Sequence, residues 1–161
     1  MSTVLDIAGP VQAEVFVLRL VDGRIHLTGP CGPAPWYVEV HEGEDPLETV
    51  VEVARRNLGS LVVAHSTSWR RARDAVVLSF VVVVEQSESE SLPVERTELA
   101  RSGTVSSPVA IATIQVLEHA LRHLSWLARE DEAVRTALPD AWGAALEAYT
   151  PEPFRNIHAT S

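Results

Sequence analysis

The stretch "HEGEDPLETVVEVARRNLGS", residues 41–60, encodes the most sharply bounded element of this chain, a short helix. Pro46 suits the first turn of a helix, and Asp45 before it can cap the free backbone N–H groups. Gly59 is the residue type that most often ends a helix. Between these boundaries apolar residues recur at helical spacing, at Leu47, Val50, Val51, Ala54 and Leu58. The sequence therefore predicts a helix over 46–58 with one face packed on a core.

Extended segments flank this helix on both sides. Asp22-Gly23 separates two β-branched runs and is a strong hairpin signal. The segment "GPCGPAP" (29–35) holds three prolines and two glycines and is predicted to be a loop. The predicted strands are 12–20, 24–28, 36–40, 60–66 and 74–85, with "TSWRRAR" (67–73) as a loop between the last two.

The second half of the chain has a different composition. Residues 86–107 are polar and rich in Ser, which indicates a surface connection. Residues 109–130 have the broad apolar stripe of a long helix, and two short helices are predicted at 131–138 and 139–149. The aromatic residues of this region, Trp126, Trp142, Tyr149 and Phe154, are expected to anchor the helices on the core. The predicted organisation is a core over 1–85, a connection over 86–107 and packed helices over 108–161, all in one domain.

Composition narrows the class of protein. The chain has 161 residues, 46% of them hydrophobic, which is enough for a globular core. Its net charge of −9 argues against DNA or RNA as a partner. All basic residues are Arg, a bias that suggests a GC-rich bacterial genome. With one cysteine, no signal-peptide pattern at the start and no run long enough to span a bilayer, we expect a cytoplasmic protein without a membrane partner.

The order of elements around the short helix resembles that of the Nudix hydrolases. The resemblance covers about residues 12–85 and rests on a hairpin, a Pro/Gly loop, a strand, a "GEDP" helix start, a closing Gly and two strands. It implies an α/β/α sandwich with a mixed sheet, here with a C-terminal helical extension. The family's sequence box is G-x5-E-x7-R-E-U-x-E-E-x-G-U, where U is a bulky aliphatic residue. Gly43, Glu44, Pro46 and Gly59 match its boundaries.

The acidic residues of that box are missing. Counting back from Gly59, the paired metal-binding glutamates fall on Arg56 and Asn57. The Glu of the Arg-Glu pair falls on Val53, and its Arg falls on Glu52. Nudix chemistry needs several carboxylates to hold Mg²⁺ on a diphosphate, and these side chains do not supply them. The resemblance is therefore to a degenerate member, with no catalytic residues, no metal site and no cofactor assigned.

Arginine and tryptophan residues are the remaining candidates for a site. Guanidinium groups can bind phosphate or carboxylate through two parallel hydrogen bonds, and tryptophan can stack on a planar ring. The alternative is a solvated basic loop in an acidic protein. The candidate ligand-binding residues are Arg55, Arg56, Trp69, Arg70, Arg71, Arg73, Glu52 and Trp36.

Histidine and cysteine residues give weaker signals. His119 and His123 have the i, i+4 spacing that can chelate a metal ion from one helix face, but no third ligand is evident. Partly buried structural histidines are the alternative, and the same holds for His26 and His65 on strands. Cys31 has no identifiable base or positive neighbour to activate it.

The sequence thus favours a catalytically inactive Nudix-like protein. It would bind a small anionic ligand, such as a nucleotide or a phosphorylated metabolite, in a regulatory or accessory role. One alternative is a metal-independent enzyme with different chemistry in the same cleft, in a specialised biosynthetic route. Another is a structural homodimer or interaction module, with helix 109–130 as the partner face.

Overall fold

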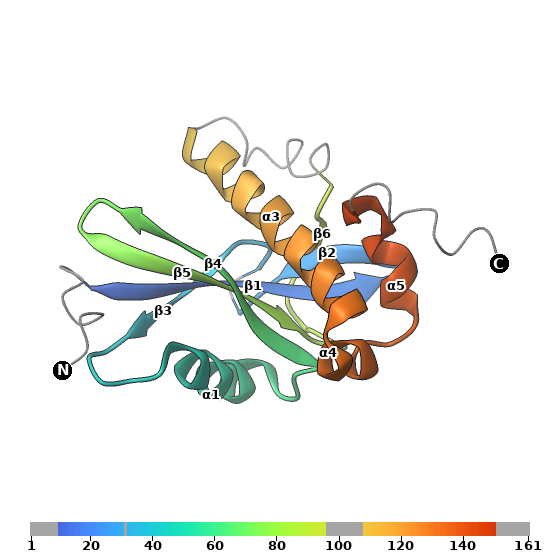
Figure 1. Ribbon diagram of the computed structural model, residues 1–161, viewed down its shortest axis with the longest axis horizontal. Coiled ribbons are helices and arrows are strands. Elements are labelled where there is room, and N and C mark those ends of the chain that lie inside the picture. The colour runs from blue at the N-terminus through green and yellow to red at the C-terminus, as the bar shows by residue number, and fades with distance from the viewer. Residues whose placement is uncertain (1–9, 31, 96–107, 151–161) are drawn as a thin grey trace.

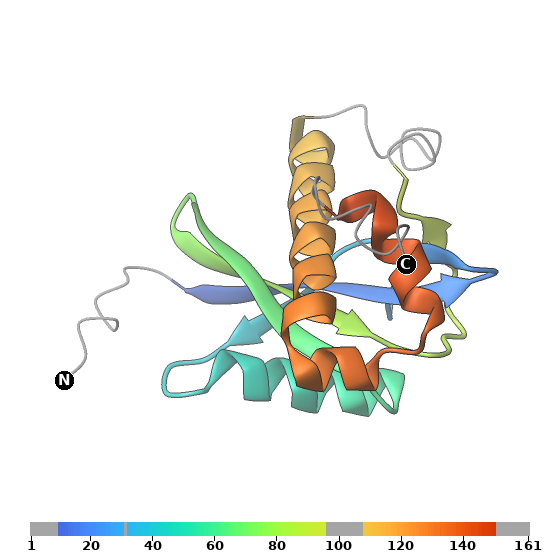
Figure 2. The ribbon, with the colours of Figure 1, turned by 45° about the vertical axis from the view of Figure 1, so that its right-hand side comes forward.

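The computed structural model describes residues 10–30, 32–95 and 108–150. They form three layers, with a mixed sheet between helix α1 (Pro46–Leu58) on one face and helix α3 (Pro108–Glu130) on the other. Figures 1 and 2 show α1 along one side of the sheet and α3 crossing the opposite side. The α/β sandwich with a mixed sheet expected from the sequence is therefore confirmed.

The sheet is built around β1 (Val11–Val21), its longest strand. β1 runs parallel to β5 (Ala75–Val83) and antiparallel to both β2 (Arg24–Thr28) and β3 (Trp36–Val40). The strand order is β4-β5-β1-β2-β6, with β3 pairing to β1 outside this path. β4 (Val63–Ala72) and β6 (Leu92–Pro93) stand at the two ends of that order.

Alternation along the strands divides the core between the two faces. Phe16 and Leu18 of β1 pack on the α3 side, whereas Val15 and Val17 pack on the α1 side. β5 does the same, which explains why its sequence is an almost unbroken apolar run. Both faces of the central strands are covered by helices.

The two local signals that defined the first half of the chain are confirmed. The β1–β2 hairpin turns through Asp22 and Gly23, which have φ of 51° and 78°. Helix α1 begins at Pro46, its first N–H groups are capped by Asp45, and Gly59 follows its last residue with φ of 84°. Asp45 accepts a hydrogen bond of 3.0 Å from the backbone N–H of Glu48.

The predicted loop over 67–73 is wrong, because most of it belongs to β4. That strand runs from Val63 to Ala72, and the chain turns only at Arg73, where φ is 54°. The pairing with β5 shifts between Ser66 and Ser68, so Thr67 is an extra residue in a β-bulge. The segment has no alternation of apolar and polar residues, so the sequence pattern did not predict a strand. β4 is at the edge of the sheet, where a strand can carry polar side chains on both faces.

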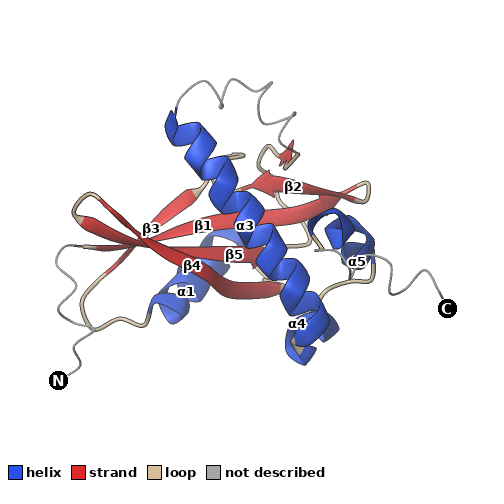
Figure 3. Cartoon of the chain, turned by 45° about the horizontal axis from the view of Figure 1, so that its top comes forward, coloured by secondary structure: helices blue, strands red, loops and turns tan. Residues whose placement is uncertain are grey.

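The C-terminal helices pack on the sheet and on each other. α3 contributes Leu117, Leu121 and Leu124, all buried, to the core on its side of the sheet. α4 (Glu132–Ala137), α5 (Ala141–Leu146) and the 3-10 turn Glu147–Tyr149 follow, close to the end of α3 (Figure 3). Trp142 is buried as expected, but Trp126 is 50% exposed and does not anchor α3.

The first part of the predicted connection over 86–107 belongs to the sheet. β6 pairs with β2 through Leu92 and Pro93, and Thr28 donates a hydrogen bond to the backbone oxygen of Glu90. Residues 96–107, like Cys31 and Phe154, lie outside the described residues. Within residues 10–30, 32–95 and 108–150, no helix combines the length and apolar character needed to cross a bilayer. The cytoplasmic location stays a prediction.

Candidate functional site

The outer surface of α1 holds the positions that correspond to the metal-binding glutamates of the resembled family. Arg56 donates to the carboxylate of Glu52 at 2.8 Å, and both side chains are mostly exposed. Asn57 donates its side-chain N–H to the backbone oxygen of Val53 at 2.8 Å. The buried face of the helix is elsewhere, at Thr49, Val50 and Ala54. Arg56 and Asn57 therefore face solvent.

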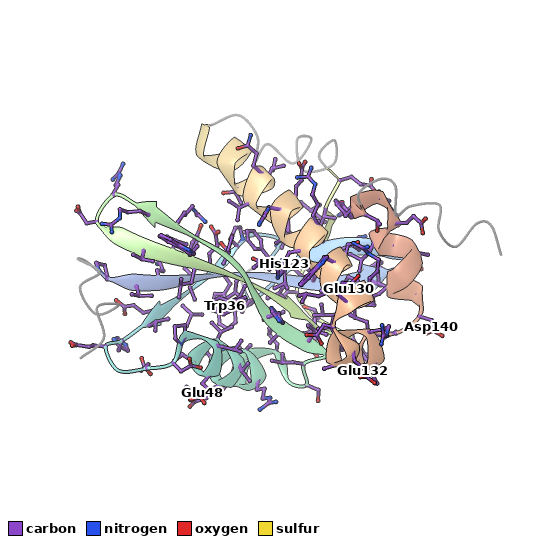
Figure 4. All side chains as sticks on the ribbon, in the orientation of Figure 1. Trp36, Glu48, His123, Glu130, Glu132 and Asp140 are labelled. Carbon is purple, nitrogen blue, oxygen red and sulfur yellow. The ribbon has the colours of Figure 1, made fainter. Side chains whose placement is uncertain are left out.

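This surface does not fit the divalent cation that the family implies. The guanidinium charge of Arg56 stands where an acid would be needed, and Glu52 already neutralises it. Glu44 accepts a hydrogen bond from the backbone N–H of His41, and Glu48 points away from the sheet (Figure 4). Among the described residues no group of three or more His, Cys, Asp or Glu side chains is arranged to hold a metal ion.

A cavity of about 590 Å³ opens where the N-terminus of α1, the bulged part of β4 and the middle of α3 meet. The bulge shapes its wall, because Thr67 turns its hydroxyl to donate to the backbone oxygen of Ser79 at 3.2 Å. Apolar side chains line the cavity together with three hydroxyl groups, two imidazoles and the carboxylate of Asp45. The lining residues are Asp45, Pro46, Leu47, His65, Ser66, Thr67, Ser68, Trp69, Leu78, Phe80 and His123.

Trp69 is the candidate ligand-binding residue that the structure places in this cavity. Its side chain is 67% exposed, a large apolar surface left in water beside Leu47, which is 40% exposed. Arg71, two residues along β4, shares the sheet face of Trp69 because strand side chains alternate. Together they place an exposed indole ring and a guanidinium group along one strip of the α1 face.

Arg70 lies on the opposite face and is committed to a buried carboxylate. Its two terminal nitrogens donate to Glu14 Oε1 and Oε2 at 2.8 and 3.0 Å. The hydroxyl groups of Tyr37 and Ser79 also donate to Glu14, at 2.9 and 3.2 Å. Glu14 is completely buried, while the side chain of Arg70 is 38% exposed. One residue from each of four strands thus meets at a single carboxylate.

This buried network changes the acid–base behaviour of its members. Burial and the negative charge of Glu14 raise the pKa of Tyr37 from 10.0 to about 12. The hydrogen bonds to Glu14 raise the pKa of Arg70. Arg70 is therefore a permanent partner of Glu14 and has limited capacity for a ligand. The sequence analysis did not single out Glu14. The one signal that could have found it is its position as a charged residue inside an otherwise apolar strand.

The remaining candidates are spread over the molecule. Arg55 is exposed near the C-terminus of α1, away from the cavity lining. Arg73 forms the β4–β5 turn. Trp36 of β3 is half-buried against the core on the α1 side (Figure 4). The eight candidates do not form one cluster. Trp69 is the one among them that lines the cavity, and Arg71 lies two residues further along the same face of β4.

Two histidines close the other side of the cavity. The rings of His65 on β4 and His123 on α3 have centroids 5.8 Å apart, and Trp126 lies 5.7 Å beyond His123. Burial, together with His65 and His119, lowers the pKa of His123. Sequence reasoning paired His123 with its helical neighbour His119 and did not connect it with His65, which is 58 residues away.

Solved structures identify the fold. No protein-family model and no curated protein matches this chain. Shewanella oneidensis NrtR, complexed with a 27mer DNA, is similar with a TM-score of 0.53 and 11% identity, covering 89% of this chain and 78% of that chain. A second structure of Shewanella oneidensis NrtR gives a TM-score of 0.52 and 12% identity, covering 93% of this chain and 83% of NrtR. The chain therefore has the Nudix-like fold of NrtR.

The same comparison corrects one prediction. The net charge led us to exclude nucleic acid polymers as partners, and that exclusion is wrong. NrtR has a similar fold and was crystallised with DNA. Total charge averages over the whole surface, so a local basic surface can meet a phosphate backbone even in an acidic protein.

Proposed function

We propose that this chain, which shares the Nudix-like fold of NrtR, is a small-molecule-binding protein with a regulatory or accessory role. In this proposal residues 43–59 are a Nudix box whose metal-binding acids have been replaced, so the protein does not hydrolyse diphosphates with Mg²⁺. The observation that carries the proposal is the cavity beside α1, whose lining includes an exposed indole ring; the α1 residues that align with the family's metal-binding acids face solvent.

The proposed ligand is a small anion that also has a planar ring, such as a nucleotide or an aromatic phosphorylated metabolite. The ring would stack on Trp69, whose large exposed area would be removed from water. The anionic group would extend along the same face of β4 toward Arg71.

A thermal-shift screen tests this proposal. Nucleotides, nucleotide sugars and phosphorylated metabolites are added to the full chain with and without Mg²⁺, and the Tm is recorded. We expect at least one compound to raise the Tm independently of Mg²⁺, with the shift abolished in Trp69→Ala and reduced in Arg71→Ala. Arg73→Ala, which changes an exposed Arg in the β4–β5 turn outside the cavity lining, is the control. Mg²⁺-dependent release of phosphate or a nucleoside monophosphate would refute the proposal.

The same samples separate the two alternatives of other classes. Turnover of a stabilising compound without added metal would favour an enzyme with altered chemistry in the cavity. Absence of any stabilising compound, with a tight dimer by analytical ultracentrifugation, would favour a homodimeric interaction module.

A second candidate function is a DNA-binding regulator. It is supported by the NrtR–DNA complex, whose protein aligns with 89% of this chain. Fluorescence polarisation with a labelled duplex, at two salt concentrations, tests it. Counterion release predicts that specific or nonspecific binding weakens as salt rises. No binding at low salt would remove this candidate without affecting the ligand proposal.

A further inference from the structure

The histidine pair at the cavity wall joins two layers of the fold. His65 comes from the edge strand β4 and His123 from α3, and their ring centroids are 5.8 Å apart. Figure 4 shows His123 on the side of α3 toward these strands. Both residues line the cavity, so a small ion or a water molecule can reach them.

Hydrogen bonding sets the proton position on His65. Its Nδ1 is 2.8 Å from the backbone oxygen of Ser66. A carbonyl oxygen only accepts hydrogen bonds, so in this contact Nδ1 carries the hydrogen and the lone pair of the neutral ring is at Nε2. Histidines that bind metal ions are commonly oriented in this way, by donating their second nitrogen to a backbone carbonyl.

We propose that His65 and His123 form a binding site for a divalent transition-metal ion of the Zn²⁺ or Ni²⁺ class. With metal–nitrogen bonds of about 2.0–2.1 Å, two imidazoles on one ion have ring centroids about 5–6 Å apart, and the observed separation is of this size. Imidazole suits Zn, Cu and Ni, whereas Mg²⁺ and Ca²⁺ prefer oxygen ligands.

The proposed site uses two protein ligands and leaves its other coordination positions open. No group of three or more His, Cys, Asp or Glu side chains in the described part of the chain is arranged around one ion, so water or a ligand in the cavity would complete the coordination. A bound ion would tie the exposed end of the sheet to α3. This proposal rests on histidines and is independent of the anion proposed for Trp69 and Arg71.

Metal titration of the full chain tests the site. The protein is treated with EDTA, desalted, and titrated with ZnCl₂, NiCl₂ or MgCl₂ by isothermal calorimetry, with Tm measured in parallel. We expect one equivalent of Zn²⁺ or Ni²⁺ to bind and raise the Tm, and Mg²⁺ to have no effect. His65→Ala and His123→Ala should each weaken binding at least tenfold.

His41→Ala is the matched control, because His41 is exposed in the loop before α1 and is expected to leave binding unchanged. His65→Gln and His123→Gln repeat the test with larger polar side chains, and circular dichroism confirms that each variant is folded. Weakening in His119→Ala as well would support the site with a third ligand. Zn²⁺ binding that persists in both His65→Ala and His123→Ala, or no Zn²⁺ and Ni²⁺ binding in the wild type, would overturn the proposal.

Discussion

At the scale of single residues, the completely buried carboxylate of Glu14 depends on three partners, Arg70, Tyr37 and Ser79. Arg70→Met would leave that carboxylate without its cation and should lower the free energy of unfolding by about 3–5 kcal/mol. Glu14→Gln should cost less, about 1–3 kcal/mol, because the partly exposed Arg70 can turn to water. Urea unfolding measures both, and the double variant should cost less than their sum.

Arg56→Met provides the control for this prediction. It removes an Arg–Glu ion pair of the same 2.8 Å length, but one in which both side chains are mostly exposed. We expect a loss below about 0.5 kcal/mol, since exposed pairs contribute little. If Arg70→Met and Arg56→Met lowered the free energy of unfolding equally, burial of Glu14 would not be what makes its ion pair with Arg70 stabilising.

The raised pKa of Tyr37 makes the stability of the protein depend on pH in the alkaline range. This pKa is raised from 10.0 to about 12, so the unfolded chain loses the phenolic proton first as pH rises. The unfolded state then binds fewer protons than the folded state, and the free energy of unfolding must fall between about pH 10 and pH 12. Tyr37→Phe should remove this part of the decline.

Tyrosinate absorbance measures that shift directly. The chain has two tyrosines, so the difference between the wild type and Tyr37→Phe isolates the titration of Tyr37. An ordinary pKa near 10 for that difference would contradict the hydrogen bond between the Tyr37 hydroxyl and Glu14.

At the scale of elements, α1 is stabilised at its N-terminus by one side chain. Asp45→Ala removes the hydrogen bond to the backbone N–H of Glu48 and should destabilise the protein by about 1 kcal/mol. Asp45→Asn keeps an acceptor and should lose much less. Chemical denaturation compares them, and equal losses would indicate that the charge at the cavity, and not the cap, is responsible.

The extended conformation of β4 depends on its pairing with β5. Its residues Ser66 to Arg71 are polar or exposed, and no alternation of apolar residues predicts a strand there. Hydrogen bonds to β5 hold the segment extended, and the bulge at Thr67 lets Ser66 and Ser68 pair with consecutive residues of β5. His65, before the bulge, pairs with Val81 of the α3-side core, and Trp69, after the bulge, pairs with Leu78 on the α1 side. Both residues line one cavity, and this arrangement could not be assembled from the sequence.

At the scale of the whole molecule, the sheet carries a separate apolar core on each face. We expect the two cores to unfold together, because the same central strands contribute to both. Leu121→Ala, at a completely buried position of α3, should lower the free energy of unfolding by about 2–5 kcal/mol. Far-UV circular dichroism and tryptophan fluorescence should show one coincident transition; separate transitions would contradict the single-domain organisation.

The sequence by itself determined the elements whose signals are local. Asp22-Gly23, the Asp45 cap, Pro46 and Gly59 act through backbone geometry within a few residues, so the hairpin and α1 could be predicted with their boundaries. That positions 53, 56 and 57 of α1 carry no acidic side chain was also readable, because it depends only on residue identity. The resemblance of element order predicted the layers that the NrtR structures share.

Tertiary structure alone decided which side chains meet. Glu14 and Arg70 are 56 residues apart, and the histidine pair is also long-range; both depend on strand register and on where α3 crosses the sheet. Strand register and helix placement depend on the burial of many apolar residues together, so they cannot be predicted from a short motif. For the same reason arginines that looked like one basic group are divided between two faces of a sheet, a turn and the outer surface of a helix.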